Sequence, residues 1–158
     1  MRKASCIVFL IIVSATAVVS HARNAVLKSE TAAWEDVVTK SFAKARGHNN
    51  LGLAYAKTNL TKRGMEEFLT AIEFDPYFAQ AHNNLGNAYF VAGDLAYAID
   101  AYETALSMKP GNVNTHFNLA MAYKRKGMIK EALSELNEVL RLNPTDEEAK
   151  MQLLALGQ

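Results

Sequence analysis

The sequence is poor in cysteine and in net charge. Cys6 is the one cysteine in 158 residues, so the chain after it offers neither disulfides nor a thiol nucleophile. Charged residues make up 21% and nearly cancel, leaving a net charge of +1. Such a balance excludes the electrostatic field that attracts nucleic acid or an anionic membrane surface. Half of the residues are apolar, which is enough for a core, and we expect packing alone to stabilise the fold.

Common catalytic motifs are missing as well. The sequence has no nucleophile elbow, no phosphate-binding glycine loop and no histidine pair with an intervening glutamate. Glu103 and the acidic run 146–148 fall where helix surfaces and first turns are expected, which is typical of solvated charges. We therefore predict that the protein is not an enzyme, with no catalytic residues, no metal and no cofactor.

Proline is scarce too, and its placement is informative. Pro76, Pro110 and Pro144 stand 34 residues apart, a period typical of a solenoid built from helical hairpins. Counting each proline as position 32 gives three units without gaps, over residues 45–78, 79–112 and 113–146. Leucine recurs at position 7, tyrosine at position 11 and a large residue at position 24, while small residues at positions 8 and 20 let two helices approach closely. In order of position, these residues are Leu51, Leu85, Leu119; Gly52, Gly86, Ala120; Tyr55, Tyr89, Tyr123; Gly64, Ala98, Ala132; and Phe68, Tyr102, Leu136.

Turn signals separate the two helices of each unit. Asn59, Gly93 and Gly127 are residue types that tolerate the left-handed backbone at a helix end. Thr61 and Asp94 are expected to cap the helices that follow. Each proline is expected to end the second helix of its unit.

The pattern at these positions resembles the tetratricopeptide repeat. The resemblance implies an all-α solenoid of helix-turn-helix repeats whose concave surface binds a protein or peptide. Some such domains grip a terminal carboxylate with a basic clamp. The matching positions here hold no lysine or arginine, so we do not expect a chaperone-tail adaptor of that type. They are Asn49, Leu53, Asn84, Asn114 and Asn118.

Both ends of the repeat array are expected to shield its apolar faces. Residues 147–158 predict a capping helix with Ala149, Leu153 and Leu156 on one face. Residues 23–44 are interpreted as a linker and an N-terminal half repeat, because large residues recur at helical spacing from residue 31 onwards. These are Trp34, which falls at position 24, Val37, Val38 and Phe42.

Three histidines, His48, His82 and His116, recur at position 4. Equivalent positions in neighbouring units lie on the order of 10 Å apart, whereas the ligands of one ion converge within about 2 Å of it. We therefore interpret them as packing residues rather than metal ligands.

A ladder of asparagines marks the first helix of each unit. Position 6 is Asn50, Asn84 and Asn118, and position 5 adds Asn49 and Asn83. An amide offers a donor and an acceptor, so the ladder has two interpretations: it pairs with the backbone of a bound peptide, or it braces neighbouring helices. The mixed, mostly neutral surface around it suits a partly apolar peptide. The candidate peptide-binding residues are Asn49, Asn50, Leu53, Asn83, Asn84, Asn87, Phe90, Phe117, Asn118, Met121 and Lys124.

The first residues resemble an export signal. Arg2 and Lys3 precede an uncharged run over residues 4–20, and small residues before Arg23 form a usable cleavage site. The run is also long enough for an uncleaved anchor. Residues 1–22 are thus predicted to be a signal peptide or a membrane anchor, and the chain to be exported to the periplasm or cell envelope.

A second resemblance concerns the segment after that run. Arg23-Asn24, Lys28-Ser29-Glu30, Trp34-Glu35-Asp36-Val37-Val38 and Lys40-Ser41 resemble the junction between membrane helix and repeats in multi-spanning bacterial proteins related to O-mannosyltransferases. In that family the repeats lie on the outer side of the membrane. The expected function is a non-catalytic interaction module on that side. Alternatives are an accessory subunit of an envelope protein glycosyltransferase and a self-assembling scaffold, a homo-oligomer that stacks through Leu153, Leu154 and Leu156.

Overall fold

The computed structural model describes residues 20, 22–38 and 45–157. Their regular structure is helical, which confirms the expected all-α class. A long helix over residues 22–38 comes first, and the apolar run 4–20 lies outside the described residues. The remaining helices are α2 (Ala45–Lys57), α3 (Thr61–Phe74), α4 (Ala79–Ala92), α5 (Leu95–Met108), α6 (Val113–Lys126), α7 (Ile129–Leu142) and α8 (Glu147–Leu156).

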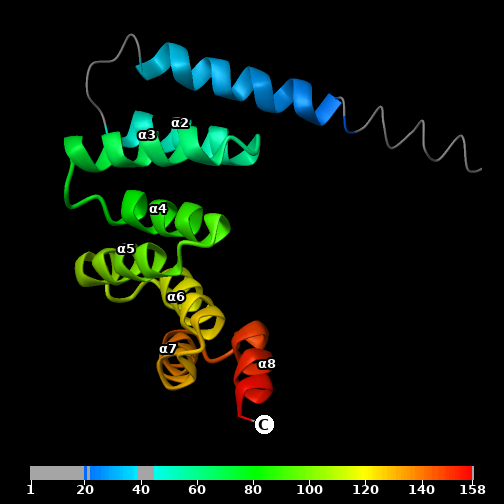
Figure 1. The fold of residues 1–158 in the computed structure, drawn as a ribbon, viewed down its shortest axis with the longest axis vertical. Coiled ribbons are helices and arrows are strands. Elements are labelled where there is room, and N and C mark those ends of the chain that lie inside the picture. Colours follow the sequence, from blue (N-terminus) through cyan, green and yellow to red (C-terminus); the bar gives the residue numbers. More distant parts are fainter. Residues whose placement is uncertain (1–19, 21, 39–44, 158) are drawn as a thin grey trace, which may run out of the picture.

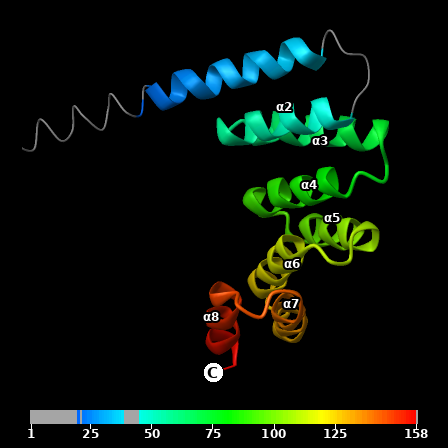
Figure 2. The same cartoon turned by 180° about the vertical axis from the view of Figure 1, so that it is seen from behind.

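The helices stack in chain order. Figure 1 shows the hairpins α2–α3, α4–α5 and α6–α7 following one another down the molecule, with the helix 22–38 at one end and α8 at the other. Each hairpin is one predicted unit. The view from behind in Figure 2 shows the same order, and the helix axes turn progressively along the stack. The first helices of neighbouring units also touch, α2 with α4 and α4 with α6, so they form one continuous face.

The turns between helices follow the sequence signals in part. Asn59, Gly93 and Gly127 have positive φ angles of 61°, 90° and 81°, as expected at the ends of α2, α4 and α6. Of the two predicted caps, Thr61 was wrong, and Asp94 was right in position only. Thr61 lies inside α3, because Leu60 takes the N-cap position and its carbonyl accepts from the Gly64 amide. Asp94 occupies the N-cap of α5, but its side chain makes no capping bond.

Side chains cap two helices at positions that were not predicted. The Asn112 side chain accepts a hydrogen bond from the Thr115 amide at the start of α6. The Asp146 carboxylate accepts one from the Ala149 amide at the start of α8, 3.0 Å away. Such bonds satisfy amides that a helix start leaves unpaired.

The core continues from unit to unit. Buried side chains of α5, α6 and α7 form one cluster around Tyr102 and Leu119. A second cluster, around Leu136, joins α6 and α7 to α8, where Ala149 is fully buried and Leu153 and Leu156 pack against it. α8 thus covers the apolar face of α6 and α7, which is the position predicted for a capping helix. Burying these faces between neighbours removes apolar surface that no hairpin covers alone.

The helix 22–38 contacts the first unit as the second helix of a further unit would. The Tyr55 hydroxyl donates to Glu35 Oε1 over 2.7 Å, and the Tyr123 hydroxyl donates to Glu103. The two tyrosines are two repeat lengths apart, and so are the two glutamates. The same contact thus joins two different pairs of neighbouring elements, which fits the predicted half repeat.

This helix also departs from the prediction in its length. Its described residues are already helical at residue 22, before the predicted start at 31, so the helix continues where the other units have a turn. Trp34 is half-buried and Val37 is 41% exposed, while Phe42 lies outside the described residues. None of the helices within the described residues has both the length and the apolar character needed to cross a membrane.

Candidate functional site

Asparagine side chains connect the first helices of neighbouring units. Asn84 Nδ2 on α4 donates to Asn49 Oδ1 on α2 over 2.8 Å, and both residues are buried, at 7% and 1% exposed. Asn49 also donates to Asn50 Oδ1 over 3.4 Å. Because buried amides are costly to leave unpaired, the bond from Asn84 to Asn49 braces the first unit against the second.

The next step of the ladder is less buried. Asn118 Nδ2 on α6 donates to Asn87 Oδ1 over 3.0 Å and to Asn83 Oδ1 over 3.4 Å, both on α4. Asn83 Oδ1 also accepts from the Thr115 hydroxyl. All three asparagines are half-buried. Here the bracing contacts lie at the surface of the continuous face made by α4 and α6.

A tyrosine fixes the orientation of one of these amides. The Tyr102 hydroxyl on α5 donates to Asn87 Oδ1 over 2.8 Å, and burial raises the pKa of Tyr102 well above its usual range, so the phenol stays protonated. Asn87 Oδ1 thus accepts two bonds, whereas its Nδ2 is used by no contact within the described residues. Asn118 Oδ1 likewise takes part in no hydrogen bond within the described residues. Both atoms reach solvent, since the described residues leave no buried side-chain nitrogen or oxygen without a partner. A donor and an acceptor therefore remain at the surface, at fixed positions.

These two asparagines lie at the middle of a groove. The groove consists of two adjoining hollows of about 600 Å³ and about 370 Å³, and Asn87 and Asn118 line both. We call them the apolar hollow and the polar hollow. The other residues of the apolar hollow are Phe90, Val91, Tyr102, Met121, Lys124 and Arg125. The other residues of the polar hollow are Asn83, Val113, Asn114, Phe117, Asp146 and Glu148.

Seven of the eleven predicted binding residues line this groove: Asn83, Asn87, Phe90, Phe117, Asn118, Met121 and Lys124. The other four, Asn49, Asn50, Leu53 and Asn84, belong to the junction of the first and second units and line neither hollow. Leu53 packs against the apolar cluster of α3 and α4. For Asn49 and Asn84, burial and their mutual hydrogen bond make bracing the role that the structure supports.

Several groove residues were not predicted. Val91 and Arg125 stand one position after Phe90 and Lys124 in their units, so the repeat register could have pointed to them. Asp146 and Glu148 come from α8. Their acidic character was noted, but their approach to the groove depends on how α8 folds back over α6, which no periodicity encodes.

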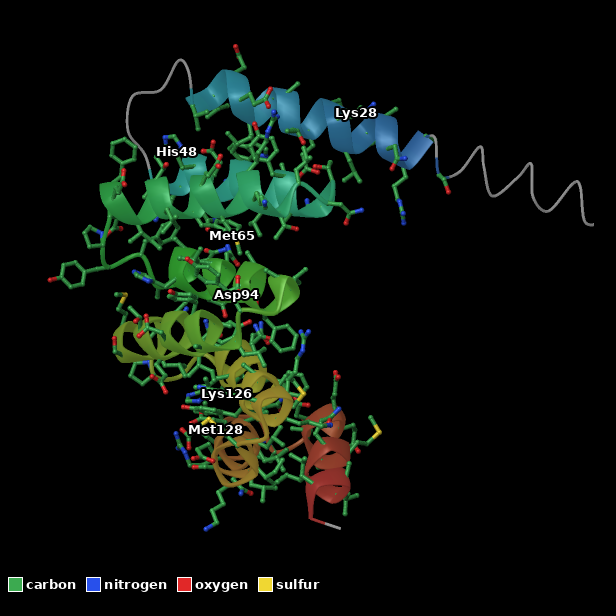
Figure 3. The ribbon with its side chains drawn as sticks, in the orientation of Figure 1. Lys28, His48, Met65, Asp94, Lys126 and Met128 are labelled. Atoms are coloured by element: carbon green, nitrogen blue, oxygen red, sulfur yellow. The ribbon has the colours of Figure 1, made fainter. Side chains whose placement is uncertain are left out.

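The repeated histidines make contacts within units and between them. His116 is 9% exposed, with Nδ1 2.6 Å from Glu135 Oε2 and Nε2 2.8 Å from the Pro110 carbonyl. His82 Nε2 lies 3.0 Å from the Pro76 carbonyl. These contacts support the packing interpretation. His48, labelled in Figure 3 beside the end covered by the helix 22–38, pairs with Glu67 over 2.8 Å. No group of three or more histidine, cysteine, aspartate or glutamate side chains in the described residues is arranged to hold a metal.

Comparison with known proteins agrees with this architecture. Three family models described as tetratricopeptide repeat match residues 45–78, 67–100 and 89–156, and together they span the three units and α8. The chain belongs to the tetratricopeptide-repeat family. No curated protein matches the sequence. The resemblance of the linker to O-mannosyltransferase-related proteins stays a prediction.

Solved tetratricopeptide-repeat structures share the fold. The first such domain of Spaghetti (RPAP3), bound to the HSP90 peptide SRMEEVD, is 23% identical, with a TM-score of 0.71; the match covers 73% of this chain and 91% of that one. MamA is 20% identical, with a TM-score of 0.75 over 80% of this chain and 74% of its own. YrrB, described as having an unusual peptide-binding site, is 17% identical, with a TM-score of 0.73 over 84% of this chain and 68% of its own.

Proposed function

We propose that the protein is a non-catalytic interaction module that binds an extended peptide segment in the groove between α4, α6 and α8. The observation that carries the proposal is the pair Asn87 and Asn118 at the middle of the groove. One half of each amide braces the two helices, and the other half faces solvent as a donor or an acceptor. Bracing and binding are thus compatible, because the internal bonds fix the amides in the orientation that a ligand meets.

The two atoms match the polar groups of a peptide backbone. A residue in an extended chain presents one carbonyl acceptor and one amide donor, which Asn87 Nδ2 and Asn118 Oδ1 complement. Side chains of the bound segment would enter the apolar hollow beside Phe90 and Met121. Amides held in place by neighbouring bonds lose little freedom on binding, which favours affinity.

The family comparisons give general support. The structures of RPAP3 and YrrB are described with a bound peptide or a peptide-binding site, and this chain shares their fold. The groove used here nevertheless differs from a basic carboxylate clamp. The five positions that match such a clamp hold four asparagines and Leu53. We therefore propose that these positions do not bind the C-terminal carboxylate of a partner.

Location is a separate part of the proposal. We propose that residues 4–20 direct the chain across a membrane and that the repeats act on its outer side, on the strength of Arg2 and Lys3 before the apolar run. Protease added to intact spheroplasts should digest the repeats. Protection until the membrane is breached would place them inside instead.

Binding is tested by selecting peptides from a random display library on the full chain and measuring their affinity by calorimetry. Asn87→Asp keeps the Oδ1 acceptor for Tyr102 and Asn118 but replaces the Nδ2 donor with an oxygen. It should weaken binding about two- to tenfold, the value of one hydrogen bond. Asn114→Asp is the matched control, because it adds the same charge to the polar hollow without touching the central amides. Equal affinities of both variants would refute the role of the Asn87 amide.

A further inference from the structure

The two hollows of the groove carry opposite charges. Lys124 and Arg125 line the apolar hollow, and no carboxylate is among its lining residues in the described part of the chain. Asp146 and Glu148 line the polar hollow, where the described residues contribute no lysine or arginine. Basic and acidic side chains thus lie at opposite ends of one groove, in a chain whose net charge is +1.

The charged side chains of the groove contact neutral groups rather than opposite charges. Lys124 Nζ donates to Gln152 Oε1 over 2.7 Å, and Arg125 lies over the Phe90 ring and donates to the Phe90 carbonyl. At the other end the carboxylate of Asp146 caps α8 and accepts from Asn143, and Glu148 is exposed. Each end therefore keeps its charge available to a ligand.

The groove is long enough for its ends to act separately. From Asn114 in the polar hollow to Arg125 in the apolar hollow, α6 rises roughly 16 Å at 1.5 Å per residue. This exceeds the Debye length of about 8 Å at physiological ionic strength, so each end responds to the ligand charge nearest to it. An extended peptide advances about 3.3 Å per residue, and about five residues fill this distance.

We propose that the partner segment is a short extended peptide with an apolar centre, acidic at the end that meets Lys124 and Arg125 and basic at the end that meets Asp146 and Glu148. This inference rests on the proposed function of the groove and names its partner chemistry. Complementary charges at both ends position the segment and reject segments of uniform charge. The apolar centre fills the space beside Phe90 and Met121.

Three synthetic peptides test the proposal against the full chain. All share the centre Leu-Phe-Leu and blocked termini; one carries two aspartates at one end and two lysines at the other, the second four aspartates, and the third four lysines. We expect the peptide of mixed charge to bind at least about fivefold more tightly than either uniform peptide, since the uniform ones meet like charge at one end. The preference should shrink in high salt.

Two charge-reversal variants test which end of the groove meets which charge of the peptide. Glu148→Lys should shift the preference to the acidic peptide, and Lys124→Glu should shift it to the basic one. The residue introduced at 124 can still accept from the Gln152 amide after that amide turns over, so the fold is expected to persist, which circular dichroism checks. Glu147→Lys and Lys126→Glu are matched controls. They make the same charge changes in the same helix turns without lining the groove, and they should leave the ranking of peptides unchanged.

Other outcomes would overturn the proposal in distinct ways. The three peptides could bind equally well, and Met121→Glu could abolish the binding of all three. That result would refute the charge preference but leave the groove as the binding site. Failure of these peptides and of the library-selected ones to bind would remove the proposed function as well. A dimer of the free chain that Met121→Glu dissociates would assign the groove to a second copy instead.

Discussion

The ring of Tyr102 lies against the backbone of Gly86, so that a Cβ atom at residue 86 would stand 2.6 Å from Tyr102 Cε1. Phe68 has the same relationship to Gly52 in the first unit, also at 2.6 Å. The third unit holds the pair Ala120 and Leu136 at these positions, both fully buried. In each unit, the side chain at this position of the second helix packs against a small residue of the first helix. An aromatic ring packs against glycine, and the smaller leucine is paired with alanine.

This relationship predicts that Gly86→Ala destabilises the protein although alanine favours helix. Overpacking costs about 1–3 kcal/mol, against a helix propensity gain of about 1 kcal/mol, so we expect a net loss of up to about 2 kcal/mol in urea unfolding. Adding Tyr102→Leu should reduce the penalty of the alanine, as the third unit suggests. Gly111→Ala is the control, because a Cβ there meets nothing within 4 Å. An unchanged free energy of unfolding in Gly86→Ala would contradict this, because it would show that the Tyr102 ring moves aside without cost.

Asn84→Ala should lower the free energy of unfolding by about 1–3 kcal/mol, because it leaves the Oδ1 of the buried Asn49 without its donor. Asn114→Ala, on the exposed start of α6, should change it by less than about 0.5 kcal/mol. Thermal unfolding followed by circular dichroism compares the two. Similar values for both variants would mean that the ladder does not brace the first two units.

Matched histidine variants should differ in cost. His116 contacts Glu135 and the Pro110 carbonyl, whereas the second unit has Ala101 at the position of that glutamate, and His82 contacts the Pro76 carbonyl. We expect His116→Ala to cost about 1–2 kcal/mol more than His82→Ala in urea titrations. The reverse order would contradict the assigned contacts.

Stability should fall as the pH rises above about 10. Burial raises the pKa of Tyr102, and burial with the hydrogen bond to Glu103 raises that of Tyr123, both far above the ordinary value of 10.0. Above that value the unfolded chain loses these protons while the folded chain keeps them, so unfolding becomes easier, by up to about 1.4 kcal/mol per pH unit for each tyrosine. Urea midpoints between about pH 9 and pH 11.5 measure this slope.

Tyr102→Phe should flatten that slope by removing the contribution of this phenol, although it also loses the bond to Asn87. Tyr77→Phe, at a side chain that is 82% exposed, is the matched control for the loss of one phenol hydroxyl. Absorbance at 295 nm should show the ionisation of Tyr102 only together with unfolding. An unchanged slope in Tyr102→Phe would mean that this phenol ionises within the folded chain.

Much of the fold could be predicted because the repeat forces the same local solution three times. The 34-residue spacing of the prolines set the hairpins, and Asn59, Gly93 and Gly127 carried the backbone signal for the turns. The cap prediction for Thr61 was wrong because a side chain caps a helix only from the N-cap position. The backbone hydrogen bond from the Gly64 amide to the Leu60 carbonyl starts the helix one residue earlier. A difference of one residue lies below what propensity resolves.

The site was harder to predict, since it depends on contacts between units. Periodicity placed Asn83, Asn87 and Asn118 on one face, but which amides meet depends on the offset between α4 and α6. The same pattern therefore fitted bracing and binding equally well. The contribution of Asp146 and Glu148 required the position of α8, which packing against Leu136 and Val139 determines.

The measurement that tests the binding groove most directly is the map of backbone amide shifts in the full chain during titration with a library-selected peptide. The account predicts that the largest shifts fall on α4 and α6 near Asn87, Asn118 and Met121 and on the first turn of α8, while the exposed face of α3 around Leu69 stays unchanged. Shifts concentrated on α3, α5 and α7, with Asn87 and Asn118 unaffected, would contradict it.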